Sequence, residues 1–369
     1  MTPLPLALHS RHEPLGARFI AVEGMEVVAS YGDPAAEHRA VTRTSGLVDL
    51  SARGRLVLLG ADRQKMLNGQ VTNNVKDLRP GQGCYAFLVN AKAKALADLN
   101  ILALTDELLL DLEPGLAPAV AARLDGFIVA DDVQVVDAAP HYGLLSVLGR
   151  QADRVIEGLA GFPEPPKELL GPVHVRHDAW GDVYLARNDR AGTGGLDFYI
   201  PTAALDAAWD VLEGRVRDIG GRPAGWDALE AARIEAGIPR YGADIDATNL
   251  PPETGQEARG ISYSKGCYSG QEVIARIRTY GQVARALRGL QLSLPGGLLP
   301  ERGTKLFKDG RDVGYLTSCL LSPTLGEPVA LGYVRRECNG PGSELVVGTP
   351  DAPARAVVVP LPFVGPQWA

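Results

Sequence analysis

The spacing of apolar residues in the first part of the chain switches between the two periods that distinguish strands from helices. Leu99, Ile101 and Ala103 fall on one face of an extended run, because every second residue of a strand faces the same side. The order strand, helix, strands, helix, strand is typical of a split βαβ unit. The predicted strands are 55–60, 84–89, 97–104, 108–112 and 132–138, and the predicted helices are 61–67 and 115–127.

The same order of elements starts again after residue 140, without sequence identity between the halves. The longest helical pattern, at 202–220, carries an apolar stripe whose members recur at spacings of three and four. That stripe consists of Leu205, Trp209, Leu212, Val216 and Ile219. Strands are predicted at 142–149, 173–178, 182–187 and 196–201, and further helices at 151–160 and 225–237.

From about Val283 the apolar runs become short and are separated by Gly, Pro and Asp. Asp309-Gly310 is a hairpin turn signal. Both features are typical of a small antiparallel β domain, either a barrel or a sandwich. We therefore divide the chain into residues 1–139, 140–282 and 283–369, and we expect a functional surface where the three parts meet.

Composition narrows the classes of protein to which the chain can belong. Its 369 residues are 46% hydrophobic and 22% charged, and 44 acidic against 37 basic residues give a formal charge of -7. That balance argues against direct nucleic-acid binding. No apolar run reaches the roughly 18 residues that cross a bilayer, and the N-terminal stretch lacks the basic start of a signal peptide. Four cysteines without a C-x-x-C pair indicate reduced thiols in a cytoplasmic protein.

The stretch "SKGCYSGQEVIARIRTYG", residues 264–281, holds the strongest candidate chemistry. Ser269 and Glu272 have the spacing of a capping box, so a helix is expected to begin just after Cys267. The positive end of that helix and the ammonium of Lys265 would both favour thiolate over thiol, which makes a cysteine reactive or able to bind metal. The alternative interpretation is that Cys267 is a small buried hydrophobic residue, since free cysteine is among the most buried residue types.

Other motifs are weaker. The "GTGG" at 192–195 precedes a predicted strand, whereas a dinucleotide-binding fingerprint requires a helix at that point. The pairs His9/His12 and His174/His177 have no cysteine or carboxylate at ligand spacing, so no metal site is predicted.

The motif "KGCYSGQE" at 265–272 resembles the signature of the YgfZ-type folate-binding proteins, Lys-Gly-Cys-aromatic-x-Gly-Gln-Glu. These proteins are relatives of the glycine-cleavage T-protein, an aminomethyltransferase. The similarity covers nearly the whole chain and is also carried by "EHRAVTRTSGLVDLSARGRLVLLGAD", "LNGQVTNNV", "ARNDRAGTGGLDFYIP" and "ARIEAGIPRYGADI". It implies an α+β fold, with two ferredoxin-like split βαβ-type domains and a C-terminal antiparallel β-barrel. These would be arranged around a central cavity that takes tetrahydrofolate or a one-carbon derivative.

Departures from the T-protein favour the cysteine-bearing branch. The T-protein strand that matches "NAKAKALADLN" carries two adjacent carboxylates, one of them needed for aminomethyl transfer, and here the pair is Ala97-Asp98. The T-protein glutamate that grips the pterin ring aligns with Thr193, whose hydroxyl offers less acceptor capacity than a carboxylate. A tyrosine three residues earlier aligns with Arg190, and the T-protein lacks a cysteine at the position of Cys267.

The resemblance implies which side chains act. The implied catalytic group is Cys267, Lys265 and Asp98. The implied folate contacts are Gln70, Asn90, Arg187, Thr193, Arg233 and Tyr268. Each also has an ordinary structural alternative, such as an internal salt bridge for Arg233, a solvated surface position for Lys265, or a turn or strand end for the polar residues.

The implied function is that of a tetrahydrofolate-binding accessory protein for the assembly or repair of iron–sulfur clusters, acting through folate and Cys267. Its partners would be iron–sulfur enzymes or assembly proteins, including an enzyme that modifies tRNA. The alternative is a folate-dependent aminomethyltransferase or related methyltransferase, in which Asp98 holds the substrate amine or a developing positive charge. A third interpretation, a thiol carrier unrelated to folate, has less support because no second cysteine lies near Cys267.

Overall fold

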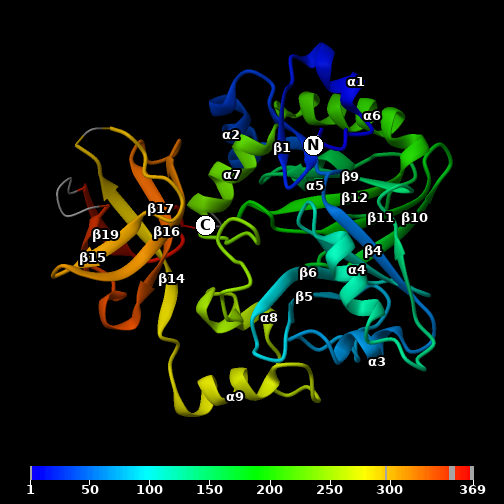
Figure 1. Cartoon of the computed structure of the whole chain (residues 1–369). Helices are drawn as coiled ribbons and strands as arrows, with labels where there is room; N and C mark the ends of the chain where they lie inside the picture. The colour runs from blue at the N-terminus through cyan, green and yellow to red at the C-terminus, as the bar shows by residue number, and fades with distance from the viewer. Residues whose placement is uncertain (1, 296, 349–353, 366–369) are drawn as a thin grey trace. The chain divides into compact units, whose positions relative to one another are not determined.

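The computed structural model describes residues 2–295, 297–348 and 354–365 (Figure 1). The chain forms two compact units, each assembled from three stretches of sequence. The first unit comprises Met1–Val89, Leu96–Glu230 and Arg259–Ser269, and the second comprises Asn90–Ala95, Ala231–Ala258 and Gly270–Ala369. Within the described residues, no helix is both long and apolar enough to cross a membrane. The three-part division of the chain and the central cavity stay predictions.

A five-stranded sheet in the first unit contains the strands expected before residue 140, in the order β5-β6-β7-β4-β8. These strands are β4 (Gly54–Leu59), β5 (Gly83–Val89), β6 (Ala95–Ala103), β7 (Leu108–Leu112) and β8 (Gln134–Asp137). Alternate residues of β6, among them Leu99 and Ile101, enter a core that is completed by α3 (Arg63–Asn68) and α4 (Ala117–Asp125). The predicted elements of this part of the chain are therefore confirmed.

A six-stranded sheet, also in the first unit, has the order β10-β11-β12-β9-β3-β13. The predicted strands are β9 (Tyr142–Leu148), β10 (Pro172–His177), β11 (Gly181–Arg187) and β12 (Gly195–Pro201). The predicted apolar stripe lies on α6 (Leu205–Asp218), where Trp209 and Leu212 share a core with Leu145 and Phe198. The helix α5 (Ala152–Ile156) is shorter than the predicted 151–160.

Strand β3 (Gly46–Asp49) was not expected from the sequence. It pairs antiparallel with β9 and parallel with β13 (Arg222–Pro223), so an N-terminal strand completes a sheet that is otherwise built from later residues. All four of its residues are buried, and it therefore lacks the alternation that marks a half-exposed strand. The remaining α-helices and strands described before the barrel are α1 (His9–His12), β1 (Arg18–Val22), β2 (Met25–Ser30), α2 (Pro34–Arg43), α7 (Trp226–Glu235), α8 (Glu257–Gly260) and α9 (Gln271–Tyr280).

The C-terminal strands form a closed six-stranded barrel in the second unit, so the barrel is confirmed over the sandwich. Its strand order is β14-β17-β16-β15-β18-β19. The strands are β14 (Arg285–Ser293), β15 (Lys305–Lys308), β16 (Arg311–Leu321), β17 (Pro328–Arg335), β18 (Glu344–Val347) and β19 (Ala354–Val359). Inward side chains such as Leu290, Leu306 and Val334 fill its interior, as expected for a barrel this small.

Buried charges join the five-stranded and the six-stranded sheets of the first unit. Asp111 on β7 accepts hydrogen bonds from Nε of Arg53 at 2.7 Å and from Nη2 of Arg190 at 2.8 Å. Arg190 also pairs with Asp197 on β12 at 2.6 Å. Burial by itself would raise the pKa of Asp111, but the charges of Arg190 and Arg53 outweigh it and hold that pKa well below its usual range. A buried charge is strongly unfavourable without its partner, so these pairs constrain how the sheets pack.

We expect Asp111→Ala to lower the free energy of unfolding by about 3–5 kcal/mol, because it leaves two buried guanidinium groups without their shared carboxylate. Urea unfolding followed by circular dichroism measures the difference. Asp206→Ala is the matched control, since the Asp206 side chain is 72% exposed in its pair with Arg11 and its loss should cost at most about 1 kcal/mol. Equal costs for the two substitutions would contradict the importance of Asp111.

Candidate functional site

The segment 259–269 belongs to the first unit and lies against the connection between α3 and β5. The hydroxyl of Thr72 donates to the carbonyl of Gly260 at 2.6 Å, and the N–H of Ser262 donates to the carbonyl of Thr72 at 3.0 Å. At the far end of the segment, the N–H of Ser269 donates to the carbonyl of Gly69 at 3.1 Å. These bonds position the "SKGCYS" stretch beside strand β5.

Lys265 anchors this stretch. Its ammonium donates to the backbone carbonyls of Asn68 at 2.6 Å, Val71 at 2.7 Å and Asn73 at 2.8 Å. Three N–H donors therefore meet three acceptors, which matches the full donor capacity of an ammonium group. Only 8% of Lys265 is exposed, so the alternative of a solvated surface lysine is wrong.

The charge of Lys265 interacts electrostatically with the thiol of Cys84 on β5. Burial raises the pKa of Cys84 to about 12, and the nearby ammonium opposes that shift. Burial likewise lowers the pKa of Lys265 to about 8, while the three carbonyl acceptors favour its charged form. The structure thus couples Lys265 to Cys84, and an action of Lys265 on Cys267 stays a prediction.

Cys267 is exposed, which contradicts its interpretation as a buried hydrophobic residue. The predicted capping box is wrong, because the N-cap of α9 is Gly270, which has no side chain that could cap the helix. Gly270 has a φ of 78°, and a Cβ at this position would lie 2.5 Å from the carbonyl oxygen of Asn90. Only glycine fits there, so the backbone explains this position of the motif.

Asp98 supplies the carboxyl group of the predicted site residues, and the fold holds it in a defined orientation. It lies on β6, where its Oδ2 accepts a hydrogen bond at 3.0 Å from the hydroxyl of Tyr85 on the neighbouring strand β5. The guanidinium of Arg259 lies 4.1 Å from the centroid of the Tyr85 ring. Tyr85 is buried, whereas Asp98 is partly exposed. A fixed phenol therefore orients a carboxyl group that solvent or a ligand can reach.

Burial, followed by the negative charge of Glu113, raises the pKa of Asp98 to about 6. The hydrogen bond from Tyr85 and the charges of Arg53 and Arg259 act in the opposite direction. Arg53 also pairs with Glu113, so the buried charges of the sheet core set the electrostatic field at Asp98. A carboxyl group that titrates near neutral pH can exchange a proton or hold a cation in the physiological range.

Gln70 and Tyr268 lie in the same unit. The side-chain oxygen Oε1 of Gln70 is buried and has no hydrogen-bond partner within the described part of the chain. A buried acceptor left unpaired costs free energy, so this oxygen suits a ligand that brings an N–H donor. Tyr268 is buried, and the ammonium of Lys265 lies 4.8 Å from the centroid of its ring. Burial raises the pKa of Tyr268 to about 12.

Two further predicted folate contacts use their side chains within the fold. On β11, Arg187 binds the carboxylate of Asp153 at 2.8 Å and donates from Nε to the carbonyl of Pro166 at 2.5 Å. The hydroxyl of Thr193 donates to the carbonyl of Val41 at 2.8 Å. A role in folate binding stays a prediction for both.

Arg233 and Asn90 lie in the second unit. Nη1 of Arg233 pairs with Asp244 at 2.5 Å, and its Nη2 donates to the hydroxyl of Ser318 at 3.0 Å. The internal salt bridge weighed for Arg233 is thus present, with Asp244 as the partner. The side-chain oxygen of Asn90 accepts from the N–H of Lys94 at 3.0 Å and closes the turn between β5 and β6.

Sequence reasoning missed Tyr85, Arg259 and Glu113. Tyr85 carries a usable signal, because a tyrosine inside an otherwise apolar strand needs a partner for its hydroxyl. The sequence gives no comparable signal for Arg259 or Glu113, because each comes near Asp98 only through the tertiary fold. Conversely, the segment 259–269 brings Lys265 and Tyr268 together, and these two residues were predicted.

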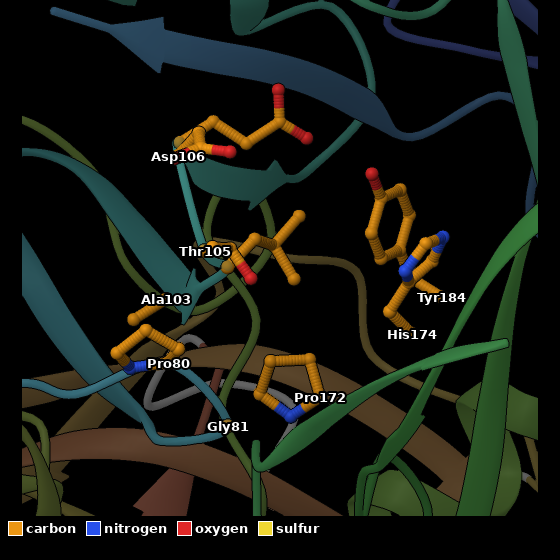
Figure 2. Close-up of a pocket in the computed structure, with 10 residues that line it drawn as sticks. Pro80, Gly81, Ala103, Thr105, Asp106, Pro172, His174 and Tyr184 are labelled. Atoms are coloured by element: carbon orange, nitrogen blue, oxygen red, sulfur yellow. The ribbon is translucent and has the colours of Figure 1, made fainter.

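A separate pocket of about 360 Å³ opens at the turn between β6 and β7 (Figure 2). The rings of His174 and Tyr184 line it, with their centroids 5.2 Å apart, and Asp106 and Glu107 supply carboxylates. Burial raises the pKa of Glu107. None of the predicted site residues lines this pocket. The Asp98 cluster, which consists of Asp98, Tyr85, Arg259 and Glu113, therefore marks the candidate site instead.

Comparison with known proteins gives matches over most of the chain. Residues 8–259 match the family described as GCVT N-terminal domain, and residues 285–365 match the family described as glycine cleavage T-protein C-terminal barrel domain. A protein named aminomethyltransferase from Thermosynechococcus vestitus is 30% identical, over 94% of this chain and 92% of its own. Another of that name, from Rubrobacter xylanophilus, is 28% identical over 96% and 93%.

Among solved structures, one that matches is the glycine cleavage system aminomethyltransferase T from Bartonella henselae. Its crystal structure has a TM-score of 0.88 to this chain at 25% sequence identity, and the match covers 98% of each chain. The similarity therefore extends over both the sheets and the barrel.

We expect Asp98→Asn to stabilise the protein at pH 7.5 by on the order of 1 kcal/mol, discounted for partial exposure. The folded-state pKa of Asp98, about 6, lies above the ordinary value of 3.8 for an aspartate, so the folded protein keeps a proton that the unfolded chain releases. The stability that this retained proton gives the folded protein is present at low pH and is lost as the pH rises through about 6, where the folded-state carboxyl group ionises. Asparagine retains an acceptor for Tyr85 without acquiring charge.

Thermal unfolding at pH 4 and at pH 7.5 measures this effect, which should vanish at the lower pH. Asp62→Asn is the control of opposite sign, because a backbone hydrogen bond from Asp132, followed by the charge of Lys65, lowers the pKa of Asp62. A stabilisation by Asp98→Asn that is the same at both pH values would contradict the raised pKa.

Proposed function

Because the chain belongs to the glycine cleavage T-protein family, we propose that it performs tetrahydrofolate-dependent one-carbon transfer of the aminomethyltransferase type. The relatives that bear the name aminomethyltransferase support this proposal. The observation that carries it is Asp98, a partly exposed carboxyl group with a pKa of about 6 that the hydroxyl of Tyr85 holds in place. Asp98 retains one carboxylate of the adjacent pair found in the T-protein strand.

Tetrahydrofolate would supply the acceptor for the one-carbon unit, and the residues of the first unit fit it in part. Gln70 offers a buried oxygen to which no group in the described ranges donates, and a reduced pterin presents N–H donors along one edge. Thr193 and Arg190, at positions where the T-protein grips the pterin, are engaged with Val41 and with buried carboxylates. We therefore assign the pterin edge to Gln70 rather than to Thr193.

Asp98 would act on the amine substrate. Above its pKa, the carboxylate attracts an ammonium group, or the positive charge that develops as a carbon–nitrogen bond breaks. Tyr85 keeps the carboxylate oriented, so no reorganisation is needed during the reaction. Below pH 6 the group is protonated and loses the charge on which this attraction depends.

We expect Asp98→Asn to lower kcat for methylene transfer from an amine donor to tetrahydrofolate by at least about 100-fold, because it removes the charge near the reacting carbon. Activity of the unchanged protein should rise with pH through a midpoint near 6, in line with the pKa of Asp98. Calorimetric titration with tetrahydrofolate separates binding from turnover, and we expect the affinity to change little.

The matched control is Asp106→Asn, an exposed carboxylate of the same unit that lines the other pocket. Its activity should equal that of the unchanged protein. Full turnover by Asp98→Asn would contradict the aminomethyltransferase proposal. An absence of tetrahydrofolate binding in the unchanged protein would contradict the assignment of folate as the ligand.

A second function is favoured by the exposure of Cys267. Of the four cysteines, only Cys267 is exposed, while Cys84 and Cys319 are half-buried and Cys338 is buried. A thiol displayed within the motif "KGCYSGQE" suits an accessory protein that uses folate and Cys267 to assemble or repair iron–sulfur clusters. The partners would be iron–sulfur enzymes or assembly proteins, with a tRNA-modifying enzyme among the targets.

We expect Cys267→Ala to fold normally, because the side chain is exposed and its removal leaves no cavity. In cells that lack the gene, this variant should fail to restore the activity of iron–sulfur enzymes, while Cys319→Ala restores it. Restoration by Cys267→Ala would exclude a function of the thiol. Restoration by Cys267→Ala but not by Asp98→Asn would favour the transferase.

A further inference from the structure

A basic pocket of about 700 Å³ lies in the second unit, lined in part by residues of the barrel strands β14, β15, β16 and β17. Five cationic side chains line it against three acidic ones, an excess of two positive charges in a chain whose overall charge is -7. The cationic residues are Lys94, Arg285, Lys305, Arg335 and Arg336, and the acidic ones are Glu253, Asp312 and Glu337. This local reversal of charge indicates a site for an anion.

Two of the cations converge on one acceptor. Nζ of Lys94 donates to the carbonyl of Thr248 at 2.6 Å, and Nη2 of Arg285 donates to the same oxygen at 3.1 Å. Glu253 is the carboxylate nearest to Arg285, at 3.4 Å from its Nε. Two positive charges thus share one carbonyl and one carboxylate, which leaves part of their charge uncompensated. Holding like charges close together is unfavourable, and a bound anion relieves that repulsion.

An unpaired hydroxyl in the same pocket gives an independent indication. Tyr333 lines the pocket and is fully buried, yet its hydroxyl has no hydrogen-bond partner in the described part of the chain. Burial, with the neighbouring Tyr315, raises the pKa of Tyr333, so the hydroxyl keeps its proton and remains a donor without an acceptor. A buried donor of this kind costs free energy until an acceptor reaches it.

The aromatic wall of the pocket also bears charge. The rings of Tyr315 and Tyr333 lie with their centroids 5.6 Å apart, and the guanidinium of Arg285 is 5.2 Å from the Tyr333 centroid. That guanidinium also lies 5.5 Å from the Tyr315 centroid, and the two cation–π contacts hold Arg285 in place beside the pocket. The exposed Arg335, the last residue of β17, and the exposed Arg336 that follows it present two guanidinium groups at the pocket.

We propose that this pocket binds a small polyvalent anion, one that carries two or more phosphate or carboxylate charges. Arg335 and Arg336 offer planar, charge-assisted hydrogen bonds to such groups, while Lys94 and Arg285 supply the inner positive charge. The site goes beyond the proposed one-carbon transfer, because none of its residues belongs to the Asp98 cluster. It makes the second unit a binding module in its own right.

Isothermal titration calorimetry on the full chain tests the proposal, with sodium pyrophosphate and sodium citrate as separate probes at an ionic strength fixed with sodium chloride. We expect saturable binding of at least one probe. The double variant Arg335→Gln/Arg336→Gln should weaken it by at least about tenfold, because two charge-assisted contacts are lost. The tighter of the two probes identifies the natural ligand as a phosphate or a carboxylate compound.

The matched control is Lys308→Gln/Arg311→Gln, which removes two positive charges from the β15–β16 hairpin of the same barrel outside the pocket. Its affinity should change less than about threefold. Equal weakening by the two double variants would show general charge attraction and overturn the site, as would an absence of saturable heat with both probes in the unchanged protein.

The variant Tyr333→Phe tests whether the hydroxyl of Tyr333 donates to the bound anion. It should weaken anion binding while leaving the melting temperature of the ligand-free protein unchanged or higher, because an unsatisfied buried donor is removed. A lower melting temperature would show that the fold already uses this hydroxyl and would overturn its assignment to the anion.

Discussion

Asp111 is the group on which the arrangement of the first unit depends. Its two oxygens accept hydrogen bonds from Arg53, which directly precedes β4 of the five-stranded sheet, and from Arg190, in the connection between β11 and β12 of the six-stranded sheet. The packing of those two sheets is therefore tied to the neutralisation of one buried carboxylate. The same charges extend to the candidate site. Arg53 pairs with Glu113, and Glu113 in turn raises the pKa of Asp98. The protonation of Asp98 is therefore a property of the whole unit and not of its own strand alone.

Much of the fold could be predicted from the sequence, because periodicity survives wherever an element has one buried face. The stripe of α6 and the strand carrying Leu99 and Ile101 are examples. Strand β3 escaped prediction because all four of its residues are buried, which removes the alternation. The capping box failed for a different reason: Gly270 adopts a left-handed conformation, and the helix begins at a glycine instead of a serine.

The candidate site was predictable only in outline. Cys267, Lys265 and Asp98 were chosen from a motif and a strand, and the structure gives each a distinct setting. The ammonium of Lys265 donates hydrogen bonds to three backbone carbonyls. No local sequence pattern reveals these bonds, because the acceptors lie in a distant segment of the chain. The partners of Asp98 have the same origin, since Tyr85 and Arg259 meet it only in the folded sheet. Pairings between distant segments, rather than local propensity, thus account for what sequence reasoning missed.

The separation between Lys265 and its acceptors has a consequence for biosynthesis. Nζ of Lys265 binds the carbonyl of Asn68, 197 positions earlier, and the residues between include a long excursion into the second unit. While the polypeptide emerges from the ribosome, the three carbonyls near Asn68 must remain hydrated until the lysine has been translated. These three hydrogen bonds therefore form only after residue 265 has been translated, and a shorter nascent chain cannot complete them.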